Sequence, residues 1–289
     1  MGFGIALAGG GTRGAAHVGI LMALEEAGLR PQSIAGTSAG SLVAGLYAAG
    51  MKPVQLKELV LSLCEDGKRL IDPDVWGVGR AALQLITFRA PTLKGLIRGN
   101  RLEKFLCSQT GPIPIRDISM RLVIPAVDIL TGDTIAYTNQ LEGLRPLNHV
   151  QWRNDVTLCR AMRASASVPG IFHPVSEGPY RLVDGGISDN LPVDLLRAAG
   201  VENILAVDVS EEYEAPKRDN FIETLSKSLT VMESRLKDCF ATKEKLLLKP
   251  ELPEEAGLLT FDTMNACMEA GYDYTKKRLP MIRALFGVS

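Results

Sequence analysis

One five-residue segment, Gly36-Thr37-Ser38-Ala39-Gly40, constrains this chain more than any other part of its sequence. The mostly apolar run 33–35 precedes it, and the run 41–49, rich in small residues, follows it. This arrangement predicts a strand that turns sharply into a helix, with Ser38 at the apex and its hydroxyl exposed. The two glycines remove side chains that would collide in such a turn. The next backbone N–H and the positive end of the helix would face negative charge forming on a bound carbonyl group. A tight turn without a chemical role is the alternative.

A glycine-rich turn lies upstream of this segment. The apolar run 3–8 predicts the first strand, Gly9-Gly10-Gly11-Thr12-Arg13-Gly14 follows it, and the run 15–27 predicts a helix. A turn of this kind exposes a row of backbone N–H groups and therefore binds anions. The anion would be either a dinucleotide phosphate, because three of these glycines fit the G-x-G-x-x-G pattern, or the oxyanion of an acyl-transfer reaction.

The sequence favours the oxyanion over the dinucleotide. A dinucleotide site requires an acidic residue about 20 positions further along the chain, and the stretch 34–38 contains none. The Gly-Lys-Ser/Thr of a nucleotide-binding P-loop is also missing. The next strand, in contrast, delivers a candidate nucleophile. A packing turn without a ligand stays open as an alternative.

Three histidines are available as the base of a Ser-His-Asp arrangement. His17 falls inside the first predicted helix, where we expect it to pack or to form a local hydrogen bond. His149 lies in a polar stretch and is expected at the surface. His173, in the irregular segment 168–174, is the one plausible histidine base. No histidine follows it, so an acid beyond residue 173 cannot satisfy the order serine, acid, histidine of the α/β-hydrolases.

An aspartate is the better candidate for the base. Asp128, Asp184 and Asp208 each close an apolar, strand-like run, and parallel α/β sheets bind ligands at the carboxyl ends of their strands. Asp184 alone is followed by two glycines, which permit the close backbone approach that an active-site carboxylate needs. An ordinary Asp-Gly turn is the alternative. To act as a base, this carboxyl needs a pKa raised by desolvation beside the serine.

The glycine-rich turn, the serine pentapeptide and Asp184-Gly185-Gly186 together resemble the motifs of the patatin-like phospholipases, and most closely their bacterial serine esterase branch. The segments 164–172 and 257–272 also look familial. The resemblance runs from the N-terminus to about Ser210. It implies an α/β fold, a three-layer sandwich with a mostly parallel central sheet and helices on both faces.

The resemblance also implies roles for individual residues. Ser38 would be the nucleophile and Asp184 the base of a Ser-Asp dyad that works without histidine. The candidate oxyanion-hole residues are Gly10, Gly11, Thr12, Arg13 and Ala39. The substrate would be a lipid or another carboxylic ester, cleaved through an acyl-enzyme as by a lipase, phospholipase A or lysophospholipase. No substrate-binding residue is assigned. A non-catalytic regulatory or binding protein on the same fold is the alternative function.

The rest of the chain alternates between strand and helix patterns. Further strands are expected near 121–129, 134–138, 180–183, 203–209 and 245–249. Helices are expected near 54–61, 154–166, 192–199, 221–242 and 262–285, the last interrupted at Pro280. This alternation is typical of a mostly parallel sheet with helices on both faces. We predict a single hydrolase domain over residues 1–289, because the sequence has no repeat, low-complexity tract or linker.

One insertion, at about 75–105, differs from its surroundings. It contains no acidic residue from Val75 to Leu102, whereas basic residues alternate there with apolar ones (Arg80, Arg89, Lys94, Arg98 and Arg101 are the basic residues). Such a segment could cap the site, admit acyl chains and touch an anionic membrane surface transiently. The alternative is an ordinary amphipathic subdomain with a solvated basic face, since glycines and Pro91 interrupt any long helix.

Composition narrows the remaining possibilities. The net charge of −1 creates no field that attracts nucleic acid, and no nucleic-acid-binding signature is present, so we expect no such partner. Five scattered cysteines without C-x-x-C spacing predict reduced thiols in a reducing compartment. Metal-ligand spacing is absent, and we expect neither metal nor cofactor. Because there is no secretory leader and no apolar run of about 20 residues, we expect a cytoplasmic protein, with peripheral contact at the inner membrane face. The sequence assigns no oligomer interface.

Overall fold

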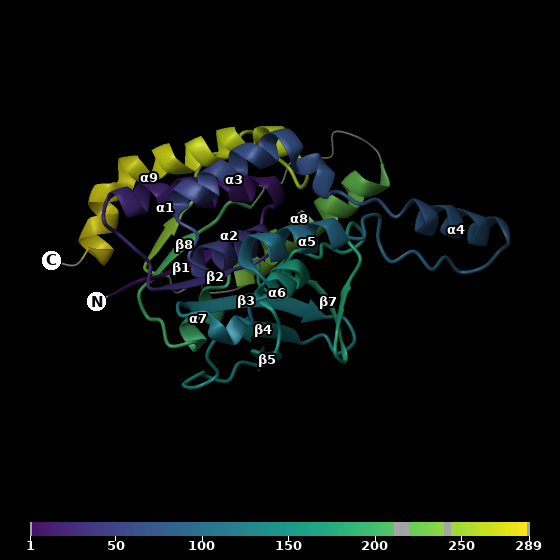
Figure 1. The fold of residues 1–289 in the computed structure, drawn as a ribbon, viewed down its shortest axis with the longest axis horizontal. Helices are drawn as coiled ribbons and strands as arrows, with labels where there is room; N and C mark the ends of the chain where they lie inside the picture. Colours follow the sequence, from purple (N-terminus) through teal and green to yellow (C-terminus); the bar gives the residue numbers. More distant parts are fainter. Residues whose placement is uncertain (1, 211–214, 216–219, 240–243, 288–289) are drawn as a thin grey trace.

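The computed structural model describes residues 2–210, 215, 220–239 and 244–287 (Figure 1). Its strands are β1 (Gly4–Leu7), β2 (Ser33–Gly36), β3 (Arg121–Asp128), β4 (Thr134–Thr138), β5 (Val150–Arg153), β6 (Val175–Glu177), β7 (Tyr180–Asp184), β8 (Ile204–Val207) and β9 (Leu246–Leu248). Its helices are α1 (Ala15–Glu26), α2 (Ala39–Ala48), α3 (Pro53–Asp66), α4 (Val75–Ile86), α5 (Asn100–Thr110), α6 (Leu158–Ser165), α7 (Val193–Ala198), α8 (Phe221–Cys239) and α9 (Met264–Phe286). Within the described ranges, none of the helices is long and apolar enough to cross a lipid bilayer.

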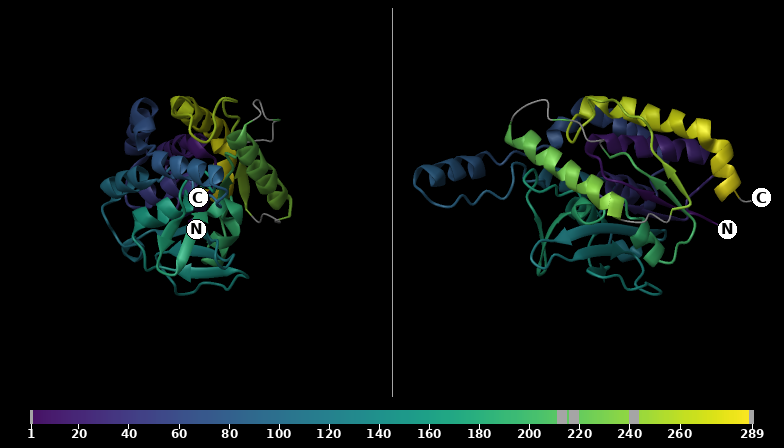
Figure 2. Two further views of the ribbon diagram at one scale, coloured as in Figure 1. Left: turned by 90° about the vertical axis from the view of Figure 1, so that its right-hand side faces the viewer. Right: turned by 180° about the vertical axis from the view of Figure 1, so that it is seen from behind.

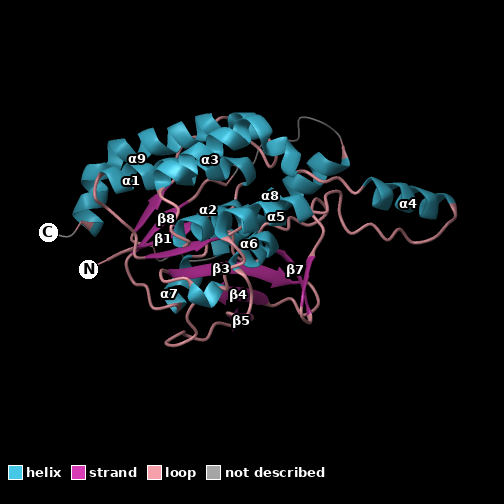
Figure 3. Cartoon of the chain, in the orientation of Figure 1, coloured by secondary structure: helices cyan, strands magenta, loops and turns pink. Residues whose placement is uncertain are grey.

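The strands form one mixed, mostly parallel sheet (Figure 3). The order is β5-β4-β3-β2-β1-β8-β9, with β7 paired to β3 and β6 paired to β7. β1, β2, β3, β8 and β9 run parallel to one another, whereas β4 and β7 are antiparallel to β3. The register brings two segments that are far apart in the sequence next to the same strand, β3. Ala35 of β2 pairs with Val123, and Asp184 of β7 pairs with Ala126, further along the same strand.

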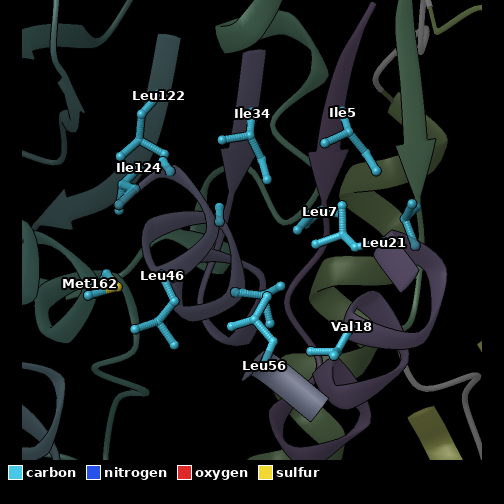
Figure 4. Close-up of a cluster of buried hydrophobic side chains, with 14 of the residues drawn as sticks. Ile5, Leu7, Val18, Leu21, Ile34, Leu46, Leu56, Leu122, Ile124 and Met162 are labelled. Atoms are coloured by element: carbon cyan, nitrogen blue, oxygen red, sulfur yellow. The ribbon is translucent and has the colours of Figure 1, made fainter. Parts of the chain in front are cut away.

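Helices cover both faces of this sheet. Ile5 and Leu7 of β1 point into one core and Ala6 into the other, as expected for a strand buried on both sides. The larger core lies against α1, α2, α3 and α6, and Figure 4 shows side chains from three adjacent strands meeting those of these helices. The smaller core lies against α7, through Val193, Leu195 and Leu196. The three-layer α/β architecture expected from the sequence is confirmed.

The C-terminal helix α9 packs closely along α1. A Cβ atom on Gly271 would lie 2.3 Å from the Ala16 carbonyl oxygen, so the contact requires glycine. α9 runs through Pro280 without a break, and the predicted interruption there is wrong. Proline removes one helical N–H donor, but Ile282 and Phe286 beyond it are buried in the larger core and hold the helix together.

The sequence pattern does not predict β5 and β6. β5 is an edge strand whose four side chains are all half-buried, so it shows no alternation of apolar and polar residues. β6 has only three residues and pairs with β7. The helix expected over 221–242 is α8, which is described as far as Cys239. The remainder of that expected helix lies outside the described residues.

The insertion at 75–105 divides into two parts. α5 belongs to the body, where it packs against α6. α4 and the segment that returns from it project away from the body (Figures 1 and 2). We call this projection, residues 75–94, the arm.

The prediction of reduced cysteines is wrong for one pair. Cys107 of α5 and Cys159 of α6 form a disulfide, with their Cα atoms 5.0 Å apart. The packing of the two helices brings together residues separated by 52 positions, which no recognisable spacing would indicate. Cys64 and Cys267 are free thiols, and the side chain of Cys239 lies outside the described part of the chain.

Candidate active site

The turn between β2 and α2 holds Ser38 in a strained backbone conformation. Its φ is 51° and its ψ is −122°, a region that residues other than glycine rarely occupy. A Cβ on Gly36 would lie 2.2 Å from the Gly40 carbonyl oxygen, and a Cβ on Gly40 would lie 2.3 Å from the Leu7 carbonyl oxygen. Both flanking glycines are therefore required by space. The sharp turn predicted from the sequence is present, and it places Ser38 immediately before α2, whose N-terminal dipole favours negative charge.

Asp184 ends β7 and is held against β3. Its side chain is 5 % exposed, and this burial raises the pKa of the carboxyl to about 6. The Gly186 N–H donates a hydrogen bond of 2.8 Å to Oδ1 of Asp184 and partly opposes the shift. Gly185 is required by space, because a Cβ there would lie 2.5 Å from the Pro125 carbonyl oxygen. A carboxyl with a pKa near neutrality can take up a proton and release it again within one catalytic cycle.

Ser38 and Asp184 line the same cavity, whose volume is about 110 Å³. The serine hydroxyl interacts with the carboxylate closely enough to lower the carboxyl pKa, against the effect of burial. Oδ2 of Asp184 has no hydrogen-bond partner with good geometry among the described residues. Hydrogen bonds between catalytic groups commonly tighten only when a substrate binds. The structure thus brings the predicted nucleophile and the predicted base to one place.

Part of the glycine-rich turn offers unpaired amides to this cavity. Gly10 and Gly11 line it together with Ser38. Within the described ranges, the N–H groups of Gly10, Gly11 and Ala39 donate no hydrogen bond. Unpaired backbone amides near a serine are what an oxyanion hole requires, and Ala39 directly follows Ser38.

The backbone amides of Thr12 and Arg13, also predicted for the oxyanion hole, are bonded to carbonyl oxygens. The Thr12 N–H donates to the carbonyl oxygen of Gly257 at 3.1 Å, and the Arg13 N–H donates to that of Gly10 at 3.2 Å. Their amides are occupied in this structure, whereas the Arg13 side chain still reaches the cavity. The Arg13 guanidinium lines the cavity, and its Nε donates to the Val209 carbonyl oxygen at 3.0 Å. Arg13 therefore anchors the glycine turn to the segment that follows β8.

Two buried side chains that sequence reasoning left without a role hold the site together. The Ser38 N–H donates to Oγ of Ser165 at 3.0 Å. The Gly9 N–H donates to Oδ1 of Asn190 at 3.1 Å. The first bond ties the serine turn to α6, and the second ties the glycine turn to the segment after Asp184. The one signal in the sequence was their position within or beside the familial motifs.

Arg163 is buried in the same region without a carboxylate partner in the described chain. It is 2 % exposed, and burial lowers its pKa to about 10, so it stays charged at neutral pH. Its guanidinium donates to the carbonyl oxygens of Gly99 at 3.0 Å and His173 at 3.1 Å, and to the Ser167 hydroxyl. The Ser167 carbonyl oxygen accepts from the Asp184 N–H at 3.0 Å. Arg163 is thus one step removed from the candidate base.

The histidines lie away from this cavity. His17 is buried, its Nε2 donates to the Ala8 carbonyl oxygen at 2.8 Å, and burial lowers its pKa to about 4. His173 lies against Asp74, with 3.2 Å between Nε2 and Oδ2. His149 has an exposed side chain. Of the described residues that line the cavity with Ser38, none is a histidine. His173 is therefore not placed as a base, whereas the local hydrogen bond expected for His17 is present.

The other two strand-ending aspartates have structural partners. Oδ1 of Asp128 accepts from the Arg181 N–H at 2.8 Å, and Oδ1 of Asp208 accepts from the Ser210 hydroxyl at 2.6 Å. Neither carboxylate lines the cavity with Ser38. Across the described ranges, no three His, Cys, Asp or Glu side chains are grouped so that they could hold a metal ion.

The cavity that contains Ser38 and Asp184 is walled by α8 rather than by the arm. Leu225, Leu229, Met232 and Leu236 of α8 form this wall. No residue of the arm is among the described residues that line the site, because the arm points away from the body. Of the predicted cap at 75–105, Leu102 and Phe105 line a second cavity beside Ser38, whereas the arm lines neither cavity. The insertion reaches the site only through α5.

A second, apolar cavity of about 160 Å³ also has Ser38 in its lining. It shares Gly11, Ser38, Val168 and Leu258 with the first cavity. Its wall consists mainly of aliphatic and aromatic side chains of α2, α3 and α5 (Leu42, Val43, Leu46, Leu56, Leu59, Val60, Leu63, Leu102, Phe105 and Leu106). The serine thus borders both the cavity that contains the carboxylate and a cavity that would favour a hydrocarbon chain.

Part of the chain is similar to known proteins. The family model of the patatin-like phospholipases matches residues 5–197. The lysophospholipase NTE1 of Saccharomyces cerevisiae is 30 % identical over 206 residues, which is 71 % of this chain and 11 % of that protein. An uncharacterized NTE family protein of Mycobacterium tuberculosis is 28 % identical over 216 residues, 74 % of this chain and 51 % of that protein. The chain therefore spans about half the length, or less, of the curated relatives it matches.

The fold is also found among solved structures. VipD from Legionella pneumophila matches with a TM-score of 0.51 and 14 % sequence identity, over 97 % of this chain and 67 % of that chain. At this level of identity the match concerns the fold alone.

Proposed function

The chain belongs to the patatin-like phospholipase family, and from that premise we propose that it is a serine acyl hydrolase that cleaves carboxylic ester bonds of lipids through a Ser-Asp dyad. The observation that carries the proposal is the convergence of Ser38, on a strained turn, and Asp184, buried with a raised pKa, on one cavity. Family membership supports the coarser activity, lipid ester hydrolysis, and the site geometry supports the residues and the steps.

The first half-reaction forms an acyl-enzyme. Oγ of Ser38 attacks the ester carbonyl carbon, and its proton passes to the Asp184 carboxylate. The amides of Gly10, Gly11 and Ala39 stabilise the negative charge on the carbonyl oxygen. The intermediate collapses with cleavage of the bond to the leaving alcohol oxygen, which receives the proton from Asp184.

The second half-reaction releases the acid. A water molecule attacks the acyl-enzyme and gives its proton to Asp184. When the bond between the acyl carbon and Oγ breaks, Asp184 returns that proton to Ser38. Because a carboxylate is a weak base even with a pKa of about 6, much of the barrier reduction falls to the oxyanion donors. We therefore expect modest turnover.

The apolar cavity supports a lipid substrate. Its aliphatic wall beside Ser38 would bind the acyl chain, and each methylene group that it buries contributes about 0.8 kcal/mol. The name of the yeast relative supports a lysophospholipase-like ester among the candidate lipids. In this proposal the protein acts in the cytoplasm and contacts a membrane surface transiently, because lipid substrates reside there.

A fluorophosphonate probe tests the proposal. Wild-type protein should be labelled covalently, and peptide mass spectrometry should place the label on Ser38. Ser38→Ala should not be labelled and should lose hydrolysis of p-nitrophenyl esters by on the order of 10⁴-fold. Asp184→Asn should react on the order of 1,000-fold more slowly.

Ser41→Ala is the matched control, since Ser41 lies on the same segment but its hydroxyl donates to the Ser38 carbonyl oxygen. This variant should keep the label. If neither wild type nor control is labelled, the alternative of a non-catalytic binding protein on this fold is supported instead.

A further inference from the structure

The helix of the arm, α4, turns its apolar side toward solvent. On an amphipathic surface helix the polar side normally faces water and the apolar side faces the protein. Here the inner side carries Gln84, whose Oε1 accepts from the Thr92 N–H at 2.9 Å across the arm, and Ala81, which is buried. The outer side carries exposed apolar residues (Val75, Trp76, Val78, Leu83, Leu85 and Ile86), of which Trp76 is 80 % and Ile86 74 % exposed.

Phe88 stands at the tip of the arm in a conformation that favours glycine. α4 ends in a Schellman-type turn, with the Phe88 N–H bonded to the Leu85 carbonyl oxygen at 3.1 Å and the Arg89 N–H bonded to that of Gln84 at 2.7 Å. The left-handed position of this motif is usually a glycine. Phe88 occupies it with a φ of 54° and a side chain that is 100 % exposed. An aromatic ring held there is unfavourable both for the backbone and for solvation, so its presence indicates a binding role.

The arm carries positive charge only. Arg80, Arg89 and Lys94 are exposed and form no ion pair with any described residue. The sequence from Val75 to Leu102 contains no acidic residue. The nearest carboxylate before it, that of Asp74, is occupied at the root of the arm by Arg98 at 2.8 Å.

The root of the arm is fixed to the walls of the active site. The N–H groups of Leu96 and Ile97 donate to the Ile171 carbonyl oxygen at 3.0 and 2.8 Å, and the Asp72 carboxylate accepts from the Gly99 N–H at 2.7 Å. Ile171 lines the cavity that contains Asp184, and its neighbour Phe172 lines the apolar cavity. The root of the arm is therefore joined directly to residues that line the two cavities.

We propose that the arm is a docking surface for the anionic lipid of a bilayer, with Trp76, Ile86 and Phe88 entering the interface and Arg80, Arg89 and Lys94 contacting the head groups. This inference rests on the proposed function for its biological sense, since a lipid hydrolase must meet its substrate at such a surface. Exposed apolar side chains on α4, combined with basic side chains on α4 and on the segment that returns from it, are the pattern of interfacial binding. A second copy of the chain is a poorer occupant, because a two-fold interface would bring identical positive surfaces together.

Vesicle co-sedimentation of the full chain tests the arm without any need for activity. Wild type and Ser38→Ala should both bind vesicles of phosphatidylcholine mixed with phosphatidylglycerol, and bind vesicles of phosphatidylcholine alone much more weakly. Phe88→Gly should weaken binding by about 10- to 100-fold, the factor for losing one buried aromatic side chain. It should not lower the unfolding temperature, since glycine relieves the left-handed strain.

Charge and position have their own variants. A triple alanine variant of Arg80, Arg89 and Lys94 should weaken binding to anionic vesicles by on the order of 100-fold, because each basic side chain near the surface contributes about a fivefold factor. Leu130→Ser is the matched control, since Leu130 is an exposed apolar residue on the turn after β3. It should bind as wild type.

The outcomes separate the two proposals. Binding by Phe88→Gly or the triple variant at wild-type strength overturns the docking surface, whatever the enzyme activity. Loss of self-association in Phe88→Gly, measured by light scattering, without loss of vesicle binding, would assign the arm to a second copy instead. If the wild-type protein binds vesicles but reacts neither with the fluorophosphonate probe nor with esters, the catalytic proposal is refuted and the docking surface is supported.

Discussion

Replacing the candidate base by its neutral isostere should make this protein more stable while removing its activity. Asp184→Asn keeps the shape of the side chain and an oxygen that can accept from the Gly186 N–H. It removes the negative charge that burial disfavours in the native protein. A residue whose only function is to support the fold would give the opposite result, because removing its charge would remove a favourable interaction.

The magnitude and its pH dependence follow from the pKa. The Asp184 carboxyl is shifted from 3.8 to about 6, and each pKa unit corresponds to about 1.4 kcal/mol, so the native charge costs about 3 kcal/mol. Because the folded pKa is raised, the native state binds the proton more tightly than the unfolded chain does. The cost is therefore absent below pH 3.8, grows between 3.8 and about 6, and is complete above that value.

Denaturant unfolding of wild type and Asp184→Asn across this pH range measures the effect. The two proteins should have equal free energies of unfolding in acid, and the variant should be more stable by about 3 kcal/mol above neutral pH, or about 5 °C in unfolding temperature for a chain of this length. Ser41→Ala provides a reference that should show no such pH dependence. A variant that is less stable than wild type at every pH would refute the reasoning, since the carboxylate would then be stabilised rather than strained by its surroundings.

Three further predictions concern the same region. The value of kcat/KM for a soluble p-nitrophenyl ester should fall about tenfold per pH unit below pH 6 as Asp184 is protonated; a rate that stays level through that range would exclude an aspartate base. Leu42→Trp, which narrows the apolar cavity, should move the optimum of a p-nitrophenyl ester series to shorter acyl chains, whereas Leu61→Trp, on the exposed side of α3, should leave it in place. Arg163→Met should lower the free energy of unfolding in denaturant by about 3 kcal/mol or more, because it leaves several buried carbonyl oxygens without a donor. Arg160→Met on the same helix removes partly exposed ion pairs and should lower it by about 1 kcal/mol. Equal losses would show that the buried hydrogen bonds of Arg163 stabilise the fold no more than a partly exposed ion pair does.

Much of the fold could be predicted because its strands are buried on both faces. β1, β3 and β8 are continuous apolar runs, and such runs are recognisable without any knowledge of tertiary structure. β5 could not be predicted, because an edge strand with half-buried side chains shows no alternation of apolar and polar residues. The helix through Pro280 and the disulfide between α5 and α6 depend on packing between distant segments, which a local pattern does not contain.

The candidate site shows the same division. Ser38, Asp184 and the glycine turn were identified because strand ends and glycines mark them in the sequence. Which amides are free to bind an anion was not predictable. The N–H groups of Thr12 and Arg13 donate to backbone carbonyl oxygens, and one of these oxygens belongs to Gly257, far away in the sequence. The wall that α8 contributes to the site was not predicted for a related reason. The composition of the insertion indicated contact with lipid, but only the structure places the arm outside the site and α8 over it.

The described non-glycine residues with positive φ give a physical reason to regard the arm as functional. They are Ser38, Phe88 and His149. His149 lies on an exposed turn, and histidine tolerates the left-handed region better than most residues. Ser38 is strained because the turn must present its hydroxyl. Neither reason applies to Phe88, because glycine would fit its turn and its ring is fully exposed to solvent. The left-handed backbone and the exposed ring of Phe88 are both unfavourable, and no contact inside the molecule offsets them. This implies that a contact with a binding partner does so. Phe88→Gly is therefore the sharpest single substitution on this chain, since stability that rises while vesicle binding falls has no explanation in the fold alone.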